Sequence, residues 1–250
     1  MINVLLSGCN GAMGDVLQEL INNEGQMQVV AGFDRVKNEK ANFPVYVNPK
    51  DCTEKVDVII DFSHYSAYES ILDYALTNKI PLVMATTGLT EENEASLIDA
   101  SKIIPVFRTA NMSIGVNVLL GIVAEAAKKL EGFDIEIIEK HHNKKVDSPS
   151  GTALMLANEI NGALDNSLEF TYGREGKSTK RQSNELGIHA IRGGTIAGDH
   201  TVIYAGEDEV IEIKHSASSK KVFAKGAVRA AKYIADKKIG LYDMRKVLEG

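Results

Sequence analysis

Residues 2–34, INVLLSGCNGAMGDVLQELINNEGQMQVVAGFD, decide the fold of the first part of the chain. A short apolar run at residues 2–7 has the composition of a buried strand, and residues 28–33 repeat it. Between these runs, residues 15–21 carry apolar side chains at helical spacing. Three glycines occupy the turn after the first run: Gly8, Gly11 and Gly14. Strand, glycine turn, helix and strand in this order predict a βαβ unit.

The glycine turn and the acidic residue that follows the second strand predict a dinucleotide site. Glycines allow a sharp turn and a close approach of the backbone to a pyrophosphate, which the next helix N-terminus can hold. Asp34 lies twenty residues after Gly14, where its carboxylate can accept hydrogen bonds from the adenosine ribose. Glycine triplets alone occur in many tight turns, and the spacing here is G-x-x-G-x-x-G rather than the commoner G-x-G-x-x-G. The complete unit is what favours dinucleotide binding.

Arg35 bears on the choice of cofactor. It follows Asp34 directly, and a guanidinium at this position can meet the 2′-phosphate of NADP. The alternative is an ordinary exposed arginine. We therefore predict that the protein uses both NADH and NADPH.

Strand and helix patterns alternate through the rest of the first hundred residues. Strands are expected at 56–61, 81–84 and 103–107, with helices at 66–77 and 90–102. This alternation predicts a parallel sheet wound on both faces, with ligands bound beyond the carboxyl ends of its strands. Polar residues at those ends are candidates for the cofactor edge, although Ser, Thr and Asn also favour turns. They are Asp61–Ser63, Ala85–Thr87 and Thr109–Met112.

The second half of the chain predicts a different kind of domain. A long helix at 113–130 precedes a set of strands, a polar loop is expected at 164–183, and residues 205–208 have the composition of a hairpin turn. The expected strands, about four in an antiparallel or mixed sheet, are 134–140, 187–192, 198–204 and 209–215. A helix at 219–238 is expected to return to the first domain. The predicted domains are 1–112 with 217–250, and 113–216.

Residues 139–153, EKHHNKKVDSPSGTA, join a predicted strand to a helix at 152–160. Either Ser150 or Thr152 suits the helix N-cap, and a helix start favours anions. Lysines, histidines and a helix N-terminus in one place suit a small substrate that carries carboxylates, although a solvated basic loop is the alternative. Adjacent residues on a strand point in opposite directions, so His141 and His142 should not share one task. This geometry also argues against a metal site.

Composition narrows the class of protein. The formal net charge of −6 argues against nucleic-acid binding, and it means that an anionic substrate must be attracted locally. We expect no membrane span, because no apolar run approaches about 18 residues, and no secretory signal. The two cysteines form no disulfide framework, so a cytoplasmic protein is expected. Histidines outside the central segment are expected to be structural: His64, His189, His200 and His215.

Residues 8–14 and 139–153 together closely resemble the 4-hydroxy-tetrahydrodipicolinate reductase family, also called dihydrodipicolinate reductase, of the diaminopimelate/lysine pathway. Residues 110–117, 191–194 and 240–244 look like the same family, so the resemblance covers essentially the whole chain. It implies an α/β fold with a Rossmann-type domain, completed by the C-terminal helices. It also implies a central α+β domain with a mixed sheet that binds a small dicarboxylate and forms a homotetramer.

The resemblance also implies residue roles. His141 would be the general acid and Lys145 a second proton donor. His142, Gly151 and Thr152 would hold the substrate carboxylates. Residues implied to line the cofactor are Gly8, Cys9, Asn10, Gly11, Ala12, Met13, Asp34, Ala85, Thr86, Thr87, Thr109, Ala110, Asn111 and Met112.

Two other functions compete with this one. A reductase of another amino or imino acid on the same scaffold would be expected to depart from the paired-histidine segment. A dinucleotide sensor without catalytic activity would need no proton donors in the second domain. The presence of His141 and Lys145 counts against the sensor.

Overall fold

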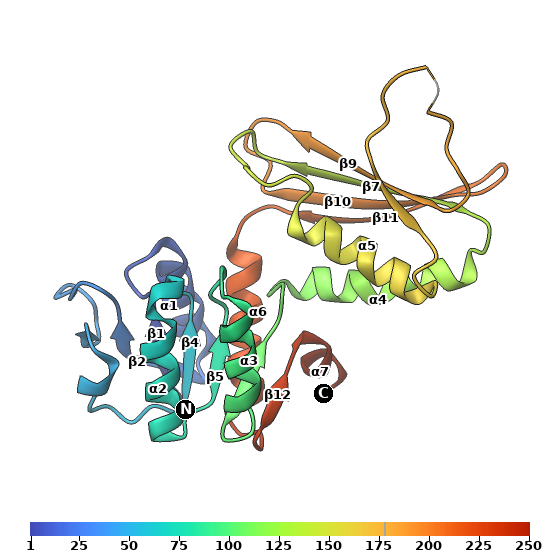
Figure 1. Ribbon diagram of the computed structural model, residues 1–250. Coiled ribbons are helices and arrows are strands. Elements are labelled where there is room, and N and C mark those ends of the chain that lie inside the picture. Colours follow the sequence, from blue (N-terminus) through green and yellow to red (C-terminus); the bar gives the residue numbers. More distant parts are fainter. Residues whose placement is uncertain (178) are drawn as a thin grey trace. The chain divides into compact units, whose positions relative to one another are not determined.

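A computed structural model describes residues 1–177 and 179–250 of the chain (Figure 1). The chain divides into two compact units, which are Met1–Ile114 with Lys221–Gly250, and Gly115–Lys220. Each unit packs helices on a sheet, and the predicted α/β class is confirmed. Among the described residues, every helix is too short or too polar to cross a lipid bilayer.

The first unit contains a parallel sheet of seven strands in the order β12-β6-β5-β4-β1-β2-β3. Strand β1 lies between β2 and β4, so the order of the strands reverses beside it. Ligand sites of doubly wound sheets lie at such a point. The strands are β1 (Ile2–Ser7), β2 (Met27–Phe33), β3 (Val45–Tyr46), β4 (Val58–Asp61), β5 (Leu82–Met84), β6 (Pro105–Arg108) and β12 (Gly240–Tyr242).

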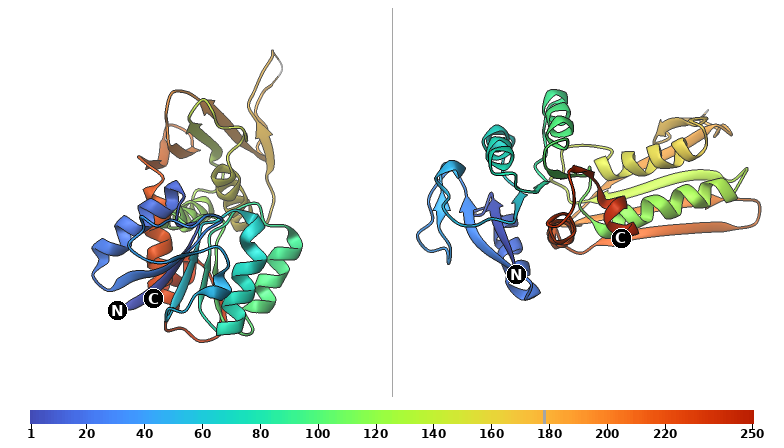
Figure 2. Two further views of the ribbon diagram at one scale, coloured as in Figure 1. Left: turned by 90° about the vertical axis from the view of Figure 1, so that its left-hand side faces the viewer. Right: turned by 90° about the horizontal axis from the view of Figure 1, so that it is seen from below.

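Helices cover both faces of this sheet. Figure 2 shows α2 (Tyr68–Asn78) and α3 (Glu91–Ala100) together on one side of the strands, and α1 (Ala12–Glu24) on the other. Helices α6 (Lys221–Ile234) and α7 (Met244–Glu249) share a hydrophobic core with α1. The C-terminal helices thus pack in the first unit. Short 3-10 turns at Pro49–Asp51 and Tyr65–Ala67 complete the unit.

Helix α6 approaches the segment between β6 and α4 (Ile114–Lys129) closely because of one glycine. A Cβ added to Gly226 would lie 1.7 Å from the backbone oxygen of Met112, so any side chain there would push the helix away. The core on this face combines Leu17 of α1 and Ile60 of β4 with Ala227 and Ile234 of α6, all fully buried. The C-terminal segment is therefore an integral part of the first unit.

The second unit contains a mixed sheet of five strands in the order β11-β10-β7-β9-β8. Strands β7, β8 and β9 run parallel, whereas β10 is antiparallel to β7 and β11. The expected loop at 164–183 was wrong in part, because residues 169–172 form strand β8 within it. The strands are β7 (Asp134–His141), β8 (Glu169–Tyr172), β9 (Glu185–Arg192), β10 (Gly198–Ala205) and β11 (Val210–Ala217).

Helices α4 (Ile114–Lys129) and α5 (Gly151–Ala163) pack on one face of this second sheet (Figure 1). Every second residue of β7 from Ile135 onward is buried, as expected for a strand with one face against helices. The buried Tyr204 hydroxyl donates to the backbone oxygen of Val123 at 2.6 Å, which ties β10 to α4. On the opposite face, Glu136 binds Arg174, Arg181 and His189.

Candidate active-site residues of the two units

The turn after β1 and the first turn of α1 each require a glycine. Gly8 has φ +79, and an added Cβ would lie 2.7 Å from the backbone oxygen of Phe62 at the end of β4. A Cβ on Gly14 would lie 2.4 Å from the backbone oxygen of Cys9. Because Cβ atoms do not occur at such distances, only glycine lets α1 begin this close to the turn.

A cavity of about 450 Å³ opens beyond the carboxyl ends of β1, β2 and β4. Five residues predicted from the sequence lie together on its wall: Gly8, Asn10, Gly11, Asp34 and Arg35. The predicted cofactor-edge segment Asp61–Ser63, at the end of β4, contributes Phe62 and Ser63 to the wall. Sequence reasoning missed the residues that follow, among them His64, which was expected to be structural. The lining residues from that side are Phe62, Ser63, His64, Ser66 and Ala67. The cavity lies at the switch point of the sheet, where a dinucleotide is expected.

Asp34 is held at the edge of this cavity. Its carboxylate accepts hydrogen bonds from the backbone N–H of Asn10 at 2.9 Å and of Arg35 at 2.8 Å. Helix α1 begins after Gly11, which provides no side-chain cap. A helix start without a side-chain cap can offer its backbone donors to a phosphate. The turn, the acid and the helix start therefore fit a dinucleotide.

Within the predicted cofactor segment Gly8–Met13, three residues line no part of the cavity: Cys9, Ala12 and Met13. The Cys9 side chain is only 2% exposed and packs on Gly32, where an added Cβ would lie 2.6 Å from the sulfur. Burial, followed by the negative charge of Asp34, raises the pKa of the Cys9 thiol to about 12. This thiol is a core group, so only the backbone of Cys9 could face a ligand.

The ends of β4 and β5 are joined by a buried carboxylate. Asp61 is fully buried and accepts hydrogen bonds at 2.6 Å from the hydroxyls of Ser63 and Thr86. Thr86 belongs to the predicted segment Ala85–Thr87, which the structure thus attaches to the cavity-lining Ser63. After β6, the side chain of Asn111 accepts from the backbone N–H of Ser113 at 2.8 Å. Residues 85–87 and 109–112 line no part of the 450 Å³ cavity.

His141 is the last residue of β7 and is only 8% exposed. Its Nδ1 lies 2.6 Å from Oε2 of Glu139, a residue with no exposed surface. Both Glu139 oxygens also accept hydrogen bonds at 2.8 Å from Arg192 at the end of β9, and Ser150 N–H donates to Oε1 at 3.0 Å. Burial alone would raise the pKa of Glu139, but Arg192, then His141, then Ser150 lower it. Glu139 is therefore held as a carboxylate.

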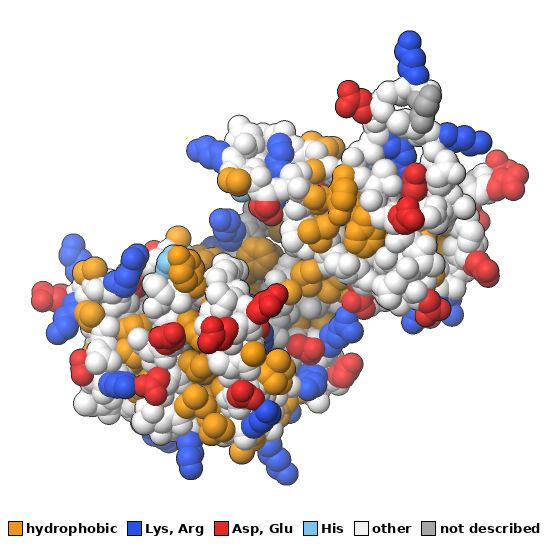
Figure 3. Space-filling model, viewed as in Figure 1, with side chains coloured by type: hydrophobic (Ala, Val, Ile, Leu, Met, Phe, Trp, Pro, Cys, Tyr) orange, Lys and Arg blue, Asp and Glu red, His pale blue; other side chains and the backbone are white. Residues whose placement is uncertain are grey.

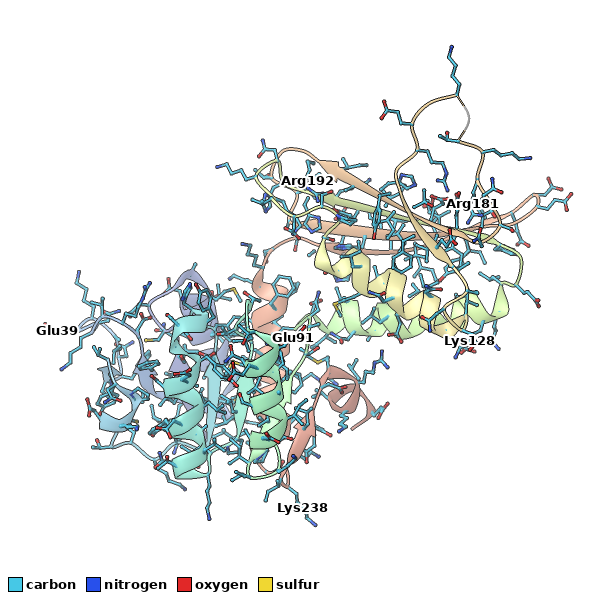
Figure 4. All side chains as sticks on the ribbon, viewed as in Figure 1. Glu39, Glu91, Lys128, Arg181, Arg192 and Lys238 are labelled. Atoms are coloured by element: carbon cyan, nitrogen blue, oxygen red, sulfur yellow. The ribbon has the colours of Figure 1, made fainter. Side chains whose placement is uncertain are left out.

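Lys145 belongs to the same network. Its Nζ lies 2.8 Å from the carboxylate of Asp147, and the backbone oxygen of Asp147 accepts from Arg192 at 2.8 Å. Figure 4 labels Arg192, the last residue of β9, and also Arg181, which precedes that strand. The ion pair with Lys145 lowers the pKa of Asp147. Hydrogen bonds thus connect both predicted proton donors through Glu139, Arg192 and Asp147.

Helix α5 begins directly after this network. Ser150, rather than Thr152, is the N-cap, because its hydroxyl accepts from the backbone N–H of Ala153 at 3.2 Å. Gly151, at the first helical position, faces open space, since an added Cβ would meet no heavy atom within 4 Å. His142 is half-exposed, in contrast to His141. An anion can approach a helix start of this kind.

His200 lies beside His141 from the neighbouring strand β10. It is 4% exposed, its Nε2 lies 3.1 Å from the Ser150 hydroxyl, and its ring centroid lies 5.2 Å from that of His141. Burial, followed by the charge of His141, lowers the pKa of His200 to about 4. This histidine is therefore neutral near neutral pH.

This lowered pKa makes the stability of the fold depend on pH. A folded-state pKa below the ordinary value stabilises the fold above about pH 6.5, and that contribution is lost as the pH falls toward 4. Because of His200, we expect the free energy of unfolding to be about 2 kcal/mol lower at about pH 5 than at about pH 7. Urea titrations at both pH values measure it. His200→Gln should reduce the difference between them, and an unchanged difference would contradict the assignment.

Charged side chains of both signs are interspersed over the visible face of each unit (Figure 3). No strongly basic face is seen there, in keeping with the net charge of −6. Attraction of an anionic substrate must then come from local groups such as those around His141.

Comparison with known proteins identifies the family. Residues 2–112 match the model for the N-terminus of dihydrodipicolinate reductase, and residues 115–248 match the model for its C-terminus. The chain belongs to the dihydrodipicolinate reductase family. It is therefore an NAD(P)H-dependent oxidoreductase.

Individual relatives span the whole chain. A 4-hydroxy-tetrahydrodipicolinate reductase of Caldanaerobacter subterraneus subsp. tengcongensis is 52% identical, with 100% of this chain and 99% of the relative covered. One from Clostridium novyi is 47% identical over the same shares. A solved structure, dipicolinate-bound dihydrodipicolinate reductase from Paenisporosarcina sp. TG-14, has TM-score 0.83 at 23% identity and covers 97% of both chains. This last similarity supports the fold.

Proposed function

We propose that the protein reduces 4-hydroxy-tetrahydrodipicolinate to tetrahydrodipicolinate in diaminopimelate/lysine biosynthesis, with loss of the 4-hydroxyl group as water and oxidation of NAD(P)H to NAD(P)+. The observation that carries the proposal is the buried His141–Glu139 pair in a chain of this family. The glycine turn and Asp34 would hold the dinucleotide, which would supply the hydride. Hydride addition to a conjugated cyclic imine leaves negative charge on the substrate, which a proton must neutralise.

His141 is the proposed general acid, because histidine delivers a proton efficiently near neutral pH. Lys145 is the proposed second donor, and its positive charge stabilises the negative charge that develops on the substrate. In the structure Lys145 is paired with Asp147, so it must exchange this partner for substrate. The hydrogen-bonded network around Glu139 keeps the two donors in one part of the second unit.

His142, Gly151 and Thr152 are the proposed partners of the substrate carboxylates. The open space beside Gly151 and the start of α5 support this role. The proposed cofactor contacts are Gly8–Met13, Asp34, Ala85–Thr87 and Thr109–Met112. The glycine turn and the fixed carboxylate of Asp34 support the first part of this set.

Use of both NADH and NADPH rests on Arg35, which lies exposed on the cavity wall beside Asp34. We expect Arg35→Ala to raise the KM for NADPH more than the KM for NADH, because only NADPH carries the 2′-phosphate that a guanidinium can bind. Steady-state kinetics with each cofactor measure this. Equal losses for both cofactors would refute the role of Arg35.

A homotetramer is part of the proposal. Ile138 and Ile203 lie on the face of the second sheet opposite α4 and α5, and both are only partly buried within one chain. A sheet face of this kind commonly pairs with a second copy of the same chain. Two free cysteines are compatible with a reducing cytoplasm, which we propose as the compartment.

A coupled assay tests the function. The protein is mixed with NADH and the product of dihydrodipicolinate synthase, and the loss of NADH absorbance is followed. Rapid oxidation of NADH supports the proposal. Oxidation only with another imino acid would favour a different reductase on this scaffold, and no oxidation with any substrate would favour a sensor.

A further inference from the structure

Glu139 is a buried charged residue at a position of β7 where packing against the helices would favour an apolar side chain. Ile135, Ile137, Glu139 and His141 succeed one another on the helix-covered face of β7, and all four are buried. Removing a carboxylate from water costs several kcal/mol unless its hydrogen bonds are replaced. Here Arg192, His141 and the N–H of Ser150 replace them. Such a complete set around one carboxylate indicates a task other than packing.

We propose that Glu139, held in place by Arg192, is a positioning residue that fixes the tautomer and the orientation of His141. This inference rests on the proposed role of His141 as the acid. Because Glu139 is ionised, it can only accept, so Nδ1 of His141 carries a proton in this hydrogen bond. The proton available to the substrate is then the one on Nε2.

Space beside Nε2 supports this assignment. A Cβ added to Gly198 would lie 3.1 Å from Nε2 of His141, so the absence of a side chain leaves that ring edge uncrowded. Within residues 1–177 and 179–250, hydrogen-bond partners of His141 side-chain atoms are found only at Nδ1. The imidazole is therefore held at one nitrogen and available at the other.

Arg192 supplies orientation as well as charge. Its two terminal nitrogens bind the two oxygens of Glu139 separately, which prevents the carboxylate from rotating away from His141. Lysine could supply the charge but not the paired geometry. Arg192 also binds the backbone oxygen of Asp147, which places the partner of Lys145 on the same support.

Other charged or titratable groups near His141 come from neighbouring elements. His200 on β10 lies edge-to-face with the ring and is neutral near neutral pH. His215 on β11 lies opposite His200 in the strand register, and burial lowers its pKa. Asp147 and Lys145 of the following loop neutralise one another. Glu139 is thus the only one of these groups that hydrogen-bonds directly to His141.

The test compares Glu139→Gln with Glu136→Gln in the full-length protein. Glu136 lies on the same strand but on the opposite face, and it too binds a histidine and arginines. Glutamine keeps the size of glutamate but removes the charge that stabilises a protonated imidazole. We expect Glu139→Gln to lower kcat by about 10–100-fold, with an unchanged KM for NADH. The alkaline limb of the pH–kcat profile should move down by about one pH unit.

Three further measurements test the role of Glu139. If Glu139 acts through His141, adding Glu139→Gln to His141→Gln should cause no further loss of kcat. NMR of the imidazole nitrogens should show His141 protonated at Nδ1 in the parent and a mixture of tautomers in Glu139→Gln. If Glu139→Gln unfolds, Arg192→Lys should still lower kcat by about tenfold without changing the KM for NADH.

Specific outcomes would overturn the inference. A folded Glu139→Gln variant with parental kcat and an unmoved pH profile is one, and equal losses in Glu139→Gln and Glu136→Gln are another. If the proposed role of His141 as the acid is wrong, the result is distinguishable. His141→Gln would then retain the parental kcat, whatever the effect of Glu139→Gln.

Discussion

His141→Gln is expected to lower kcat by about 10²–10⁴-fold, the range typical of a correctly placed general acid. Glutamine retains hydrogen-bonding capacity but has no proton to deliver near neutral pH. Because His141 belongs to the second unit and the glycine turn to the first, NADH binding should remain near normal. Stopped-flow kinetics and NADH fluorescence titration measure the two quantities.

His189→Gln provides a matched control for this variant. His189 also bonds to a glutamate of β7, with its Nε2 2.7 Å from Glu136, but on the sheet face away from α4 and α5. It should keep parental turnover. If His141→Gln kept parental turnover as well, His141 would have no role as the acid.

Lys145→Ala is expected to cause a comparable loss of kcat, about 10²–10⁴-fold. The substitution removes a proton donor and a positive charge that attracts a dicarboxylate, so the substrate KM should rise too. Steady-state kinetics at saturating NADH separate the two effects. Lys144→Ala is the control, since Lys144 is exposed and is the immediate neighbour in the sequence.

Loss of activity in Lys144→Ala equal to that in Lys145→Ala would show that only the general positive charge of the loop matters. A double variant, His141→Gln with Lys145→Ala, that turned over like the parent would end the proposal for both residues.

The dinucleotide half was largely predictable because its signals are local. Strand β1, the glycine turn and Asp34 follow from short-range periodicity and turn chemistry, and the structure brings Gly8, Asp34 and Arg35 to one cavity. The start of α1 was less predictable. Its helix begins at Ala12, several residues before the apolar spacing becomes visible, because the glycine turn continues directly into it.

Partners from distant parts of the chain could not be predicted in this way. Glu139 and Arg192 are separated by 53 residues and meet only because β7 and β9 are neighbours in the sheet. Strand order within a mixed sheet is not visible in the pattern of a single strand. For the same reason β8 was taken for loop, since Glu169–Tyr172 has a weak pattern and becomes a strand by pairing with β9.

The position of His200 beside His141 also could not be predicted from local sequence patterns. An isolated histidine in a strand pattern is expected to be structural, and nothing nearby in the sequence points to His141. The register of β10 against β7 places His200 opposite Glu139, and the Ser150 cap then completes its surroundings. Burial, rather than residue type, makes it neutral.

The packing of α6 and α7 on β1 and β4 has a consequence for biosynthesis. Strand β1 is translated long before α6 and α7, which cover one face of its sheet. A nascent chain that ends before Lys221 exposes Val4, Leu6 and Ile60 to solvent and to other chains. Final folding of the first unit must therefore wait until residues 221–250 have been synthesised, and truncations that remove them should aggregate rather than yield a smaller stable protein.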